Sequence, residues 1–258
     1  MSMNRTFFTT SWDDGHPQDL RVAELLAKYG FCGTFYVPIR NDEGLPVLDA
    51  ASLRSLATTA EIGSHTLDHR YLNTVPDVEA SRQIVDGKRE LEQILGQPVA
   101  GFCYPGGAYS NRHCRMVATA GFSYARTTSN LYGKTMLDPL RMPTTVQLYP
   151  HGRRVFLTNY VRRLDWGTRG GLLWQALSAD GLALRLQAML DAVLRSGGVF
   201  HLWGHSYELD EFDGWHLLER FLHYAAKRIP QSDRVSNGAL ALPGRYSGIV
   251  ARTTAIKI

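Results

Sequence analysis

Residues 7–15 read FFTTSWDDG, an aromatic and β-branched run that ends in two aspartates and a glycine. Such a run is typical of a buried strand, and we expect it to deliver Asp13 and Asp14 into a loop at its carboxyl end. The same arrangement recurs along the chain, where short apolar runs lead into glycine or ionisable residues and then into helical periodicity. This alternation of strand and helix predicts a parallel sheet.

The expected elements alternate from one end of the chain to the other. Strands are expected over residues 7–12, 32–38, 61–64, 99–104, 122–128, 140–147 and 199–203, and helices over residues 19–29, 49–60, 78–95, 112–120, 172–177, 181–195 and 215–228. The residues that could bind a ligand or take part in a reaction follow the strands that end near Trp12, Ile62, Tyr104 and Trp203. Because a closed sheet brings such ends together, we expect an α/β fold, a distorted barrel of about seven β/α units.

The composition is that of an ordinary globular protein. Its 258 residues are enough for one catalytic domain, which we expect over residues 1–258 with an insertion at 149–180, where the periodic pattern weakens. The 28 basic and 24 acidic residues give a net charge of +4, and basic residues concentrate only at Arg153-Arg154 and Arg162-Arg163. That is too little for a nucleic-acid interface, so we expect no nucleic-acid partner.

Three features bear on where the protein works. The first residues lack the apolar core and cleavage site of a signal peptide, and no apolar run reaches the roughly 18 residues of a transmembrane segment. The three cysteines, Cys32, Cys103 and Cys114, have no metal-binding or redox spacing, and an odd number fits a reducing compartment. We therefore expect a cytoplasmic protein without a transmembrane segment.

Two histidines follow the third expected strand, in the sequence SHTLDH of residues 64–69. His65 and His69 would lie on one face of a helical turn, where both rings can reach one ion. Alone, either this pair or the adjacent aspartates would be weak evidence, because surface histidines and Asp-Gly turns are common. Together, one carboxylate and two imidazoles make the ligand set of a catalytic metal site. The second carboxylate is left free to transfer protons.

The last expected strand supplies two further histidines. His201 and His205 point to the same face under strand alternation, and either could protonate a leaving group. We favour His205 because it lies at the strand end, and His201 stays the alternative. Near another strand end, the glycines of residues 104–107 (YPGG) would let a backbone N–H approach a developing oxyanion.

These stretches resemble the motifs of the polysaccharide deacetylase family, the NodB-homology enzymes of carbohydrate esterase family 4, in a divergent bacterial form. The family's Thr-Phe-Asp-Asp-Gly is similar to residues 10–15, its His-Ser/Thr-x-x-His to residues 65–69, its arginine-proline-glycine motif to residues 103–107, and its apolar strand ending in histidine to residues 199–205. The resemblance implies a distorted (β/α)₇ barrel, in agreement with the expectation from strand order.

The resemblance also implies residue roles. By analogy, the ligands of a divalent metal, most simply Zn²⁺, are Asp14, His65 and His69, and the catalytic groups are Asp13 as general base, His205 as general acid and the Gly106 N–H as oxyanion donor.

The chain departs from the family pattern in two motifs. Cys103 occupies the position of an arginine that braces the catalytic aspartate in the family, and Arg141 is our candidate replacement from a neighbouring strand. The family's Asp-Trp pair, which tunes the acid histidine, has its nearest counterpart in Asp165-Trp166. The candidate substrate-binding residues are Tyr104, Pro105, Arg141 and Trp203.

The implied activity is metal-dependent removal of an N-acetyl group from a carbohydrate. For a cytoplasmic enzyme, the expected partners are N-acylated sugars on the way to a surface glycan: nucleotide sugars, lipid-linked intermediates or polymers of lipopolysaccharide O-antigen assembly. Two alternatives stay open, namely hydrolysis of another C–N bond in a formamide or cyclic ureide, and a carbohydrate-binding relative that has lost activity. The 149–180 region is a candidate lid or subunit contact, and the sequence leaves open whether the protein is a monomer or a homo-oligomer.

Overall fold

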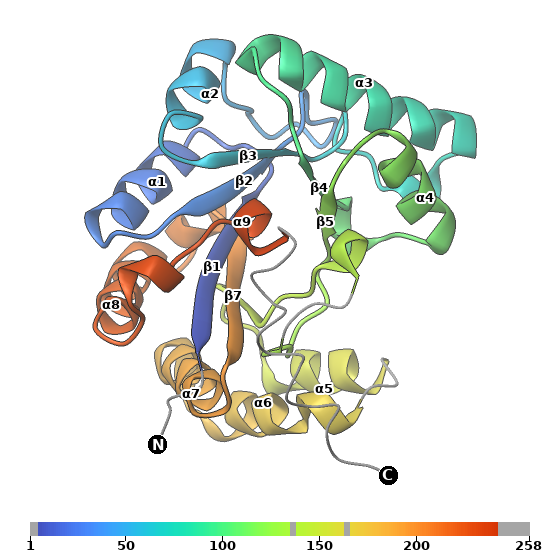
Figure 1. Cartoon of the computed structure of the whole chain (residues 1–258). Helices are drawn as coiled ribbons and strands as arrows, with labels where there is room; N and C mark the ends of the chain where they lie inside the picture. Colours follow the sequence, from blue (N-terminus) through green and yellow to red (C-terminus); the bar gives the residue numbers. More distant parts are fainter. Residues whose placement is uncertain (1–4, 135–137, 163–165, 242–258) are drawn as a thin grey trace.

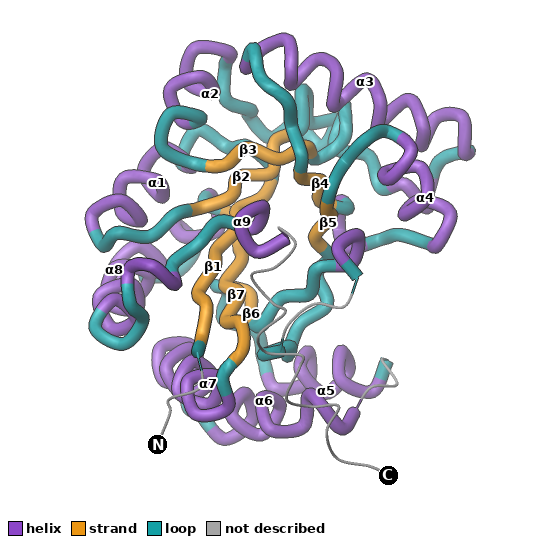
Figure 2. The backbone as a smooth tube through the Cα atoms, viewed as in Figure 1, coloured by secondary structure: helices purple, strands orange, loops and turns teal. Residues whose placement is uncertain are grey.

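The computed structural model describes residues 5–134, 138–162 and 166–241. All strand pairs of its single sheet are parallel, and the strand order is β5-β4-β3-β2-β1-β7-β6. The strands are β1 (Thr6–Asp13), β2 (Gly33–Val37), β3 (Glu61–Ser64), β4 (Gly101–Cys103), β5 (Tyr124–Arg126), β6 (Val146–Gln147) and β7 (Gly198–His205). Figures 1 and 2 show that the sheet curls around a central hollow, which makes the fold a distorted half-barrel.

Helices of the described residues surround this sheet. They are α1 (Asp19–Lys28), α2 (Ala50–Leu56), α3 (Asp77–Leu95), α4 (Asn111–Thr119), α5 (Arg153–Val161), α6 (Trp166–Ser178), α7 (Gly181–Ser196), α8 (Gly214–Ala226) and α9 (Asn237–Ala241). Figure 1 shows α1 to α4 along the outside of β1 to β5, and α5, α6 and α7 in a row beyond β7. None of the helices in these residues combines the length and the apolar character needed to span a lipid bilayer.

Strand β1 shows how the sequence places the site. Successive side chains of a strand point to opposite faces. Phe8 and Trp12 therefore belong to the large core between the sheet and the helices, whereas Phe7 belongs to a smaller cluster in the hollow, with Tyr36 and Cys103. Asp13 lies on the same side as Phe7, so the last residue of the strand faces into the hollow at its carboxyl end.

The predicted fold class is confirmed, and the largest local difference lies between β6 and β7. The sequence pattern is weak over residues 149–171, yet α5 and the first half of α6 form there. Helix α5 has three environments: Phe156 is buried, Asn159 lines a cavity and Val161 is exposed. A helix with three such faces has no single apolar stripe, which explains why periodicity missed it. The predicted strand at 140–147 shortens to β6 because residues 139–141 form a 3₁₀ turn.

The domain prediction, residues 1–258, includes segments 1–4 and 242–258, which lie outside the described residues, and it stays a prediction. The predicted insertion at 149–180 corresponds to the segment that carries α5 and α6.

Candidate active site

The carboxyl ends of the strands meet around one cavity of about 640 Å³. Register explains the convergence, because Asp13 at the end of β1 pairs with Tyr36 of β2 on one side and with His205 of β7 on the other. The cavity is lined by Asp13, Asp14, Glu43, His65, His69, Tyr71, Gly106, Gly107, Thr128, Ser129, Asn130, Gln147, His151, Val155, Asn159, Arg162, Trp203, His205 and Tyr207. Its walls thus come from both halves of the chain.

Asp14, His65 and His69 form a buried group whose donor atoms all lie within 4.8 Å of one another. Asp14 Oδ1 is 3.0 Å from His69 Nε2 and 3.5 Å from His65 Nε2. Yet this oxygen makes no hydrogen bond of acceptable geometry within the described residues. Three donor atoms that converge without satisfying one another fit a divalent cation better than they fit a hydrogen-bonded cluster.

The backbone around these ligands is held in an uncommon conformation. Asp14 has φ of 76°, Thr66 of 70° and His69 of 57°, all in the left-handed region that non-glycine residues seldom adopt. Such strain persists where the surrounding structure enforces it, and it concentrates at functional sites. The strained residues lie in the two loops that carry Asp14 and the His65–His69 pair, where these loops turn toward each other.

Further contacts orient the ligands. His65 Nδ1 lies 2.9 Å from the Cys103 carbonyl oxygen, which leaves Nε2 directed at Asp14. The Tyr207 hydroxyl donates to Asp14 Oδ2 at 3.0 Å. Burial alone would raise the pKa of the Asp14 carboxyl, but the neighbouring His65 and His69 imidazoles outweigh it and hold the pKa well below its usual range. Partners of this kind fix ring orientation in metal sites.

Asp13, the neighbouring carboxylate, has a different partner. Arg126, the last residue of β5, is fully buried and donates through Nη2 to Asp13 Oδ1. Its guanidinium carbon lies 5.3 Å from the ring centre of Tyr36 and 4.8 Å from that of Trp203. Cys103 Sγ is 3.7 Å from Asp13 Oδ2. The arginine that the third motif lacks is therefore supplied by the adjacent strand.

Arg126 corrects the sequence-based proposal for Arg141. Arg141 donates to Asp138 and Asn111, at 2.8 and 2.9 Å, and is not among the residues that line the cavity. It is not the brace of Asp13, because the 3₁₀ turn at 139–141 directs it to these surface partners. A sequence signal for Arg126 did exist, since it is a charged residue near the end of a predicted strand.

His205 lies at the end of β7 and faces the metal-ligand group. Its Nε2 is 3.9 Å from Asp14 Oδ2, and its Nδ1 is 3.0 Å from the Glu208 carboxylate. Burial lowers the pKa of His205, but the Glu208 carboxylate and the charges of Asp14 and Asp13 outweigh it and raise the pKa to about 9. The ring therefore holds a proton at neutral pH. Glu208, in the 3₁₀ turn η4 (Tyr207–Asp210), was not identified from the sequence.

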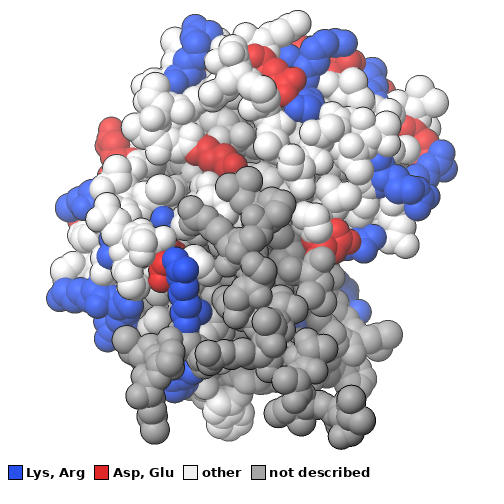
Figure 3. Space-filling model, viewed as in Figure 1, with Lys and Arg blue, Asp and Glu red and all other residues white. Residues whose placement is uncertain are grey.

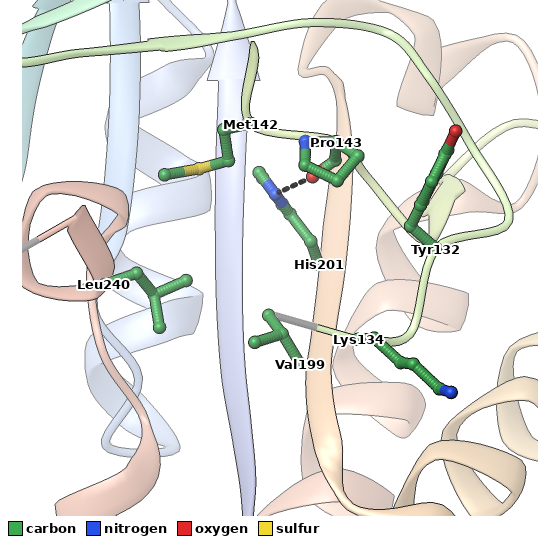
Figure 4. A pocket seen from close by; sticks show the side chains of 7 residues that line it. All are labelled: Tyr132, Lys134, Met142, Pro143, Val199, His201 and Leu240. Atoms are coloured by element: carbon green, nitrogen blue, oxygen red, sulfur yellow. Dashed lines mark hydrogen bonds between the residues drawn. The ribbon is translucent and has the colours of Figure 1, made fainter. Parts of the chain in front are cut away.

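The alternative histidine, His201, lies deeper in the hollow. Its Nδ1 is 3.0 Å from the Pro143 carbonyl oxygen, as Figure 4 shows, and its Nε2 is 2.8 Å from Ser11 Oγ. Burial and the charge of Arg126 lower the pKa of His201 to about 3, so the ring is neutral. His201 lines a small separate pocket with Met142 rather than the large cavity.

A hydrogen-bonded chain connects Glu208, the ion-pair partner of His205, to the segment before α5. Glu208 accepts from Gln147 Nε2 at 3.2 Å, and Gln147 Oε1 lies 2.8 Å from His151 Nε2. The His151 carbonyl in turn accepts from Arg185 at 2.9 Å. The nearest sequence counterpart of the family's tuning pair, Asp165-Trp166, lies outside the residues whose side chains are described. Glu208 instead lies beside His205 and raises its pKa.

The remaining predicted residues divide into two groups. Gly106 and Trp203 line the cavity. Gly106 has φ of +60°, and a Cβ there would lie 2.1 Å from the Tyr71 ring, so only glycine fits. The N–H groups of Gly107 and Ala108 close this turn on the preceding carbonyls, which leaves the Gly106 N–H outside those two bonds.

Tyr104 and Pro105 are buried and are not among the lining residues. The Tyr104 ring stacks on Tyr109, and its hydroxyl donates to the Leu140 carbonyl at 3.1 Å. The structure therefore places the Tyr104 ring in the core rather than in contact with a ligand. Tyr71, which the sequence analysis did not single out, lines the cavity beside His69.

Sequence comparison with known proteins finds matches in the first half of the chain. Residues 3–125 match the family model for polysaccharide deacetylase. The peptidoglycan-N-acetylglucosamine deacetylase of Bacillus cereus is 27% identical over 121 residues, which cover 46% of this chain and 55% of that protein. The chain thus spans about half the length of the curated relatives it matches.

Similarity to solved structures extends over nearly the whole chain. A chitin deacetylase from the fungal pathogen Colletotrichum lindemuthianum has a TM-score of 0.57 and 13% identity, with 93% of this chain and 88% of that one covered. A carbohydrate esterase family 4 pseudoenzyme from Bacillus anthracis has a TM-score of 0.55 and 13% identity, with 93% and 66% covered. At these identities the likeness concerns the fold. The first half of the chain is thus similar in sequence to the polysaccharide deacetylase family, and the whole chain is similar in fold to deacetylases of known structure.

Proposed function

We propose that the protein is a metal-dependent carbohydrate N-deacetylase. The observation that carries this proposal is the convergence of Asp14, His65 and His69 in a cavity that also presents Asp13 and His205. One carboxylate and two imidazoles leave coordination positions open, which is typical of catalytic zinc. We therefore propose Zn²⁺ as the metal. When bound, such a cation polarises an acyl carbonyl and lowers the pKa of a water molecule.

The protein's own groups supply the proton transfers. Asp13, held by Arg126, takes the proton of the attacking water as general base. The Gly106 N–H is the proposed donor to the oxyanion of the tetrahedral intermediate. His205, protonated at neutral pH because of Glu208, gives its proton to the departing amine. Its position in the cavity, and the burial of neutral His201 outside it, favour His205 as the acid.

For the substrate, we propose an N-acetylated sugar of bacterial surface-polysaccharide assembly, such as an O-antigen precursor, presented as a nucleotide sugar, a lipid-linked intermediate or a polymer. The B. cereus relative is named for N-acetylglucosamine deacetylation, which supports an acetamido sugar. The cavity offers Trp203 and Tyr71 as aromatic walls for a sugar ring. We also propose a cytoplasmic location, which the three unpaired cysteines support because Cys32 is an exposed thiol.

The test measures metal content and acetate release together. Purified protein is assayed for bound zinc and for acetate released from N-acetylated nucleotide sugars and glycans, with Asp13→Ala as the matched variant. We expect stoichiometric zinc in both proteins and a loss of roughly 10²–10⁴-fold in turnover for Asp13→Ala.

Two other outcomes would count against the proposal. Release of formate, or opening of a cyclic ureide, without acetate release would identify hydrolysis of a different C–N bond. Glycan binding without any turnover would identify a relative that has lost activity, as the B. anthracis pseudoenzyme of the same fold illustrates. The intact set of Asp13, Asp14, His65, His69 and His205 favours activity.

A further inference from the structure

Helices α5, α6 and α7 expose most of the large apolar side chains on the described surface. Those exposed in the described residues are Tyr71, Val78, Val85, Val155, Leu157, Val161, Trp174 and Leu184, and five of these eight lie on α5, α6 and α7. Val155 lines the cavity, whereas Val161, Trp174 and Leu184 are 64%, 67% and 56% exposed. The three helices pack side by side in one row (Figure 1). An apolar surface of this kind marks an interaction site.

The same segment carries the net charge of the chain. Residues 149–178 contain five arginines and one aspartate, a net charge of +4, which equals the +4 of all 258 residues. Outside this segment, 23 basic and 23 acidic residues therefore balance. Figure 3 shows both signs interspersed over α2, α3 and α4. Arg169 is buried and Arg153 pairs with Asp180, so in the described residues the exposed, unpaired positive charge beside these apolar side chains comes from Arg154 and Arg162.

Helix α5 connects this region to the cavity. Its Asn159 and the next residue after its end, Arg162, line the cavity, and its Phe156 is buried. Arg154, Leu157 and Val161 are exposed on the remaining arc, since positions three and four apart share a helix face. A surface bound to that arc would lie next to the cavity mouth.

We propose that this face, defined by Arg154, Leu157, Val161, Trp174 and Leu184, binds the surface of an anionic lipid bilayer. Exposed tryptophan and aliphatic side chains enter the interfacial layer, and neighbouring arginines meet anionic headgroups. Bound in this way, the enzyme would present its cavity to a sugar on a lipid carrier. That link to a lipid-linked substrate rests on the proposed function, whereas bilayer binding itself does not.

A second copy of the chain is the main competing occupant. A two-fold contact would place this face against itself and bring two net charges of +4 together. Like charges at such short range repel. An anionic bilayer complements both the charge and the apolar side chains, so the lipid surface is the occupant that the composition favours.

Flotation of the full chain with lipid vesicles tests this inference without any substrate. One set of vesicles is phosphatidylcholine alone, and the other is an equal mixture of phosphatidylcholine and phosphatidylglycerol. We expect binding to the anionic vesicles only, weakened by salt. Trp174→Ser/Leu184→Ser should reduce the bound-to-free ratio about tenfold, and Arg154→Gln about fivefold.

The matched controls remove equivalent side chains elsewhere. Val78→Ser/Val85→Ser removes two exposed valines of α3, and Arg115→Gln removes an exposed arginine of α4; both should bind as the wild type does. Circular dichroism and zinc content verify folding of each variant. Absence of wild-type binding, or equal binding by face and control variants, overturns the proposal. A dimer in light scattering that the face variants dissociate, with no vesicle binding, would assign the face to a second copy instead.

Discussion

The two walls of the cavity differ in whether their residues lie inside the part of the chain that matches the family model. On one wall, the proposed metal ligands come from two short loops inside the matched region, with Asp14 beside the proposed base Asp13 and His65 four residues from His69. On the other wall, His205 and Glu208 come from β7 and η4, well beyond that region. Metal binding fixes the direction of every donor atom, whereas an acid histidine needs only a carboxylate within hydrogen-bond distance, which many positions can supply.

The largest effect is expected from removing a metal ligand. Asp14→Ala or His69→Ala leaves two donors of the three, so both variants should lose zinc on dialysis and lose on the order of 10³-fold or more in activity. Elemental analysis after dialysis measures the metal directly. Asp13→Ala is the control, because it removes the adjacent carboxylate and should keep the zinc. Retention of zinc in both ligand variants would show that these residues do not form the metal site.

The next largest effect concerns the Arg126–Asp13 ion pair, which joins the ends of β5 and β1. Arg126→Met leaves the Asp13 charge buried without its partner and should destabilise the fold by about 3–5 kcal/mol. Denaturant unfolding measures this loss. Arg141→Met, which removes a half-exposed arginine paired with Asp138, should cost less than about 1 kcal/mol.

The double variant Arg126→Met/Asp13→Asn separates charge from packing. With the carboxylate gone, no unpaired charge remains, so stability should recover in part relative to Arg126→Met alone. An equal loss in the single and double variants would assign the effect to lost packing against Tyr36 and Trp203 instead.

These residues also show how far the sequence could predict the site. The ligands were identifiable because the aspartate pair and the histidine pair are local patterns that follow predicted strands. Arg126 offered only the weak signal of a charged residue near the end of a predicted strand, and its partner could not be predicted because Asp13 lies 113 positions away. In the sheet order, three strands separate β5 from β1. The curl of the sheet brings the two strand ends together, and the predicted barrel did not specify which strand ends would meet.

On the second wall, Glu208→Gln tests the tuning of His205. The pKa of His205 is raised to about 9 by groups that include the Glu208 carboxylate. The His205 ring is therefore protonated below that pH and loses its proton as the pH rises through it. Glu208→Gln should lower this pKa toward 6.5, and activity should then decline from a lower pH, by about tenfold near pH 8.

NMR titration of His205 in the metal-free protein measures this pKa directly, and a profile of kcat/KM against pH reports its consequence. Glu211→Gln is the matched control, since Glu211 lies nearby but contacts Tyr149 rather than His205. Identical titration curves for Glu208→Gln and the wild type would show that Glu208 does not raise the pKa of His205.

The smallest effect is expected on α5, which also lines the cavity outside the matched region. The sequence did not predict this helix, because its buried, cavity-lining and exposed residues divide its circumference. Asn159 lines the cavity far from the proton-transfer groups in sequence, so Asn159→Ala should raise KM severalfold and leave kcat unchanged, as expected for a contact that binds substrate and transition state equally. Thr158→Ala changes the exposed neighbouring position of the same helix and should alter neither constant. A fall in kcat for Asn159→Ala at unchanged KM would place α5 in the chemistry itself and remove the distinction between the two walls.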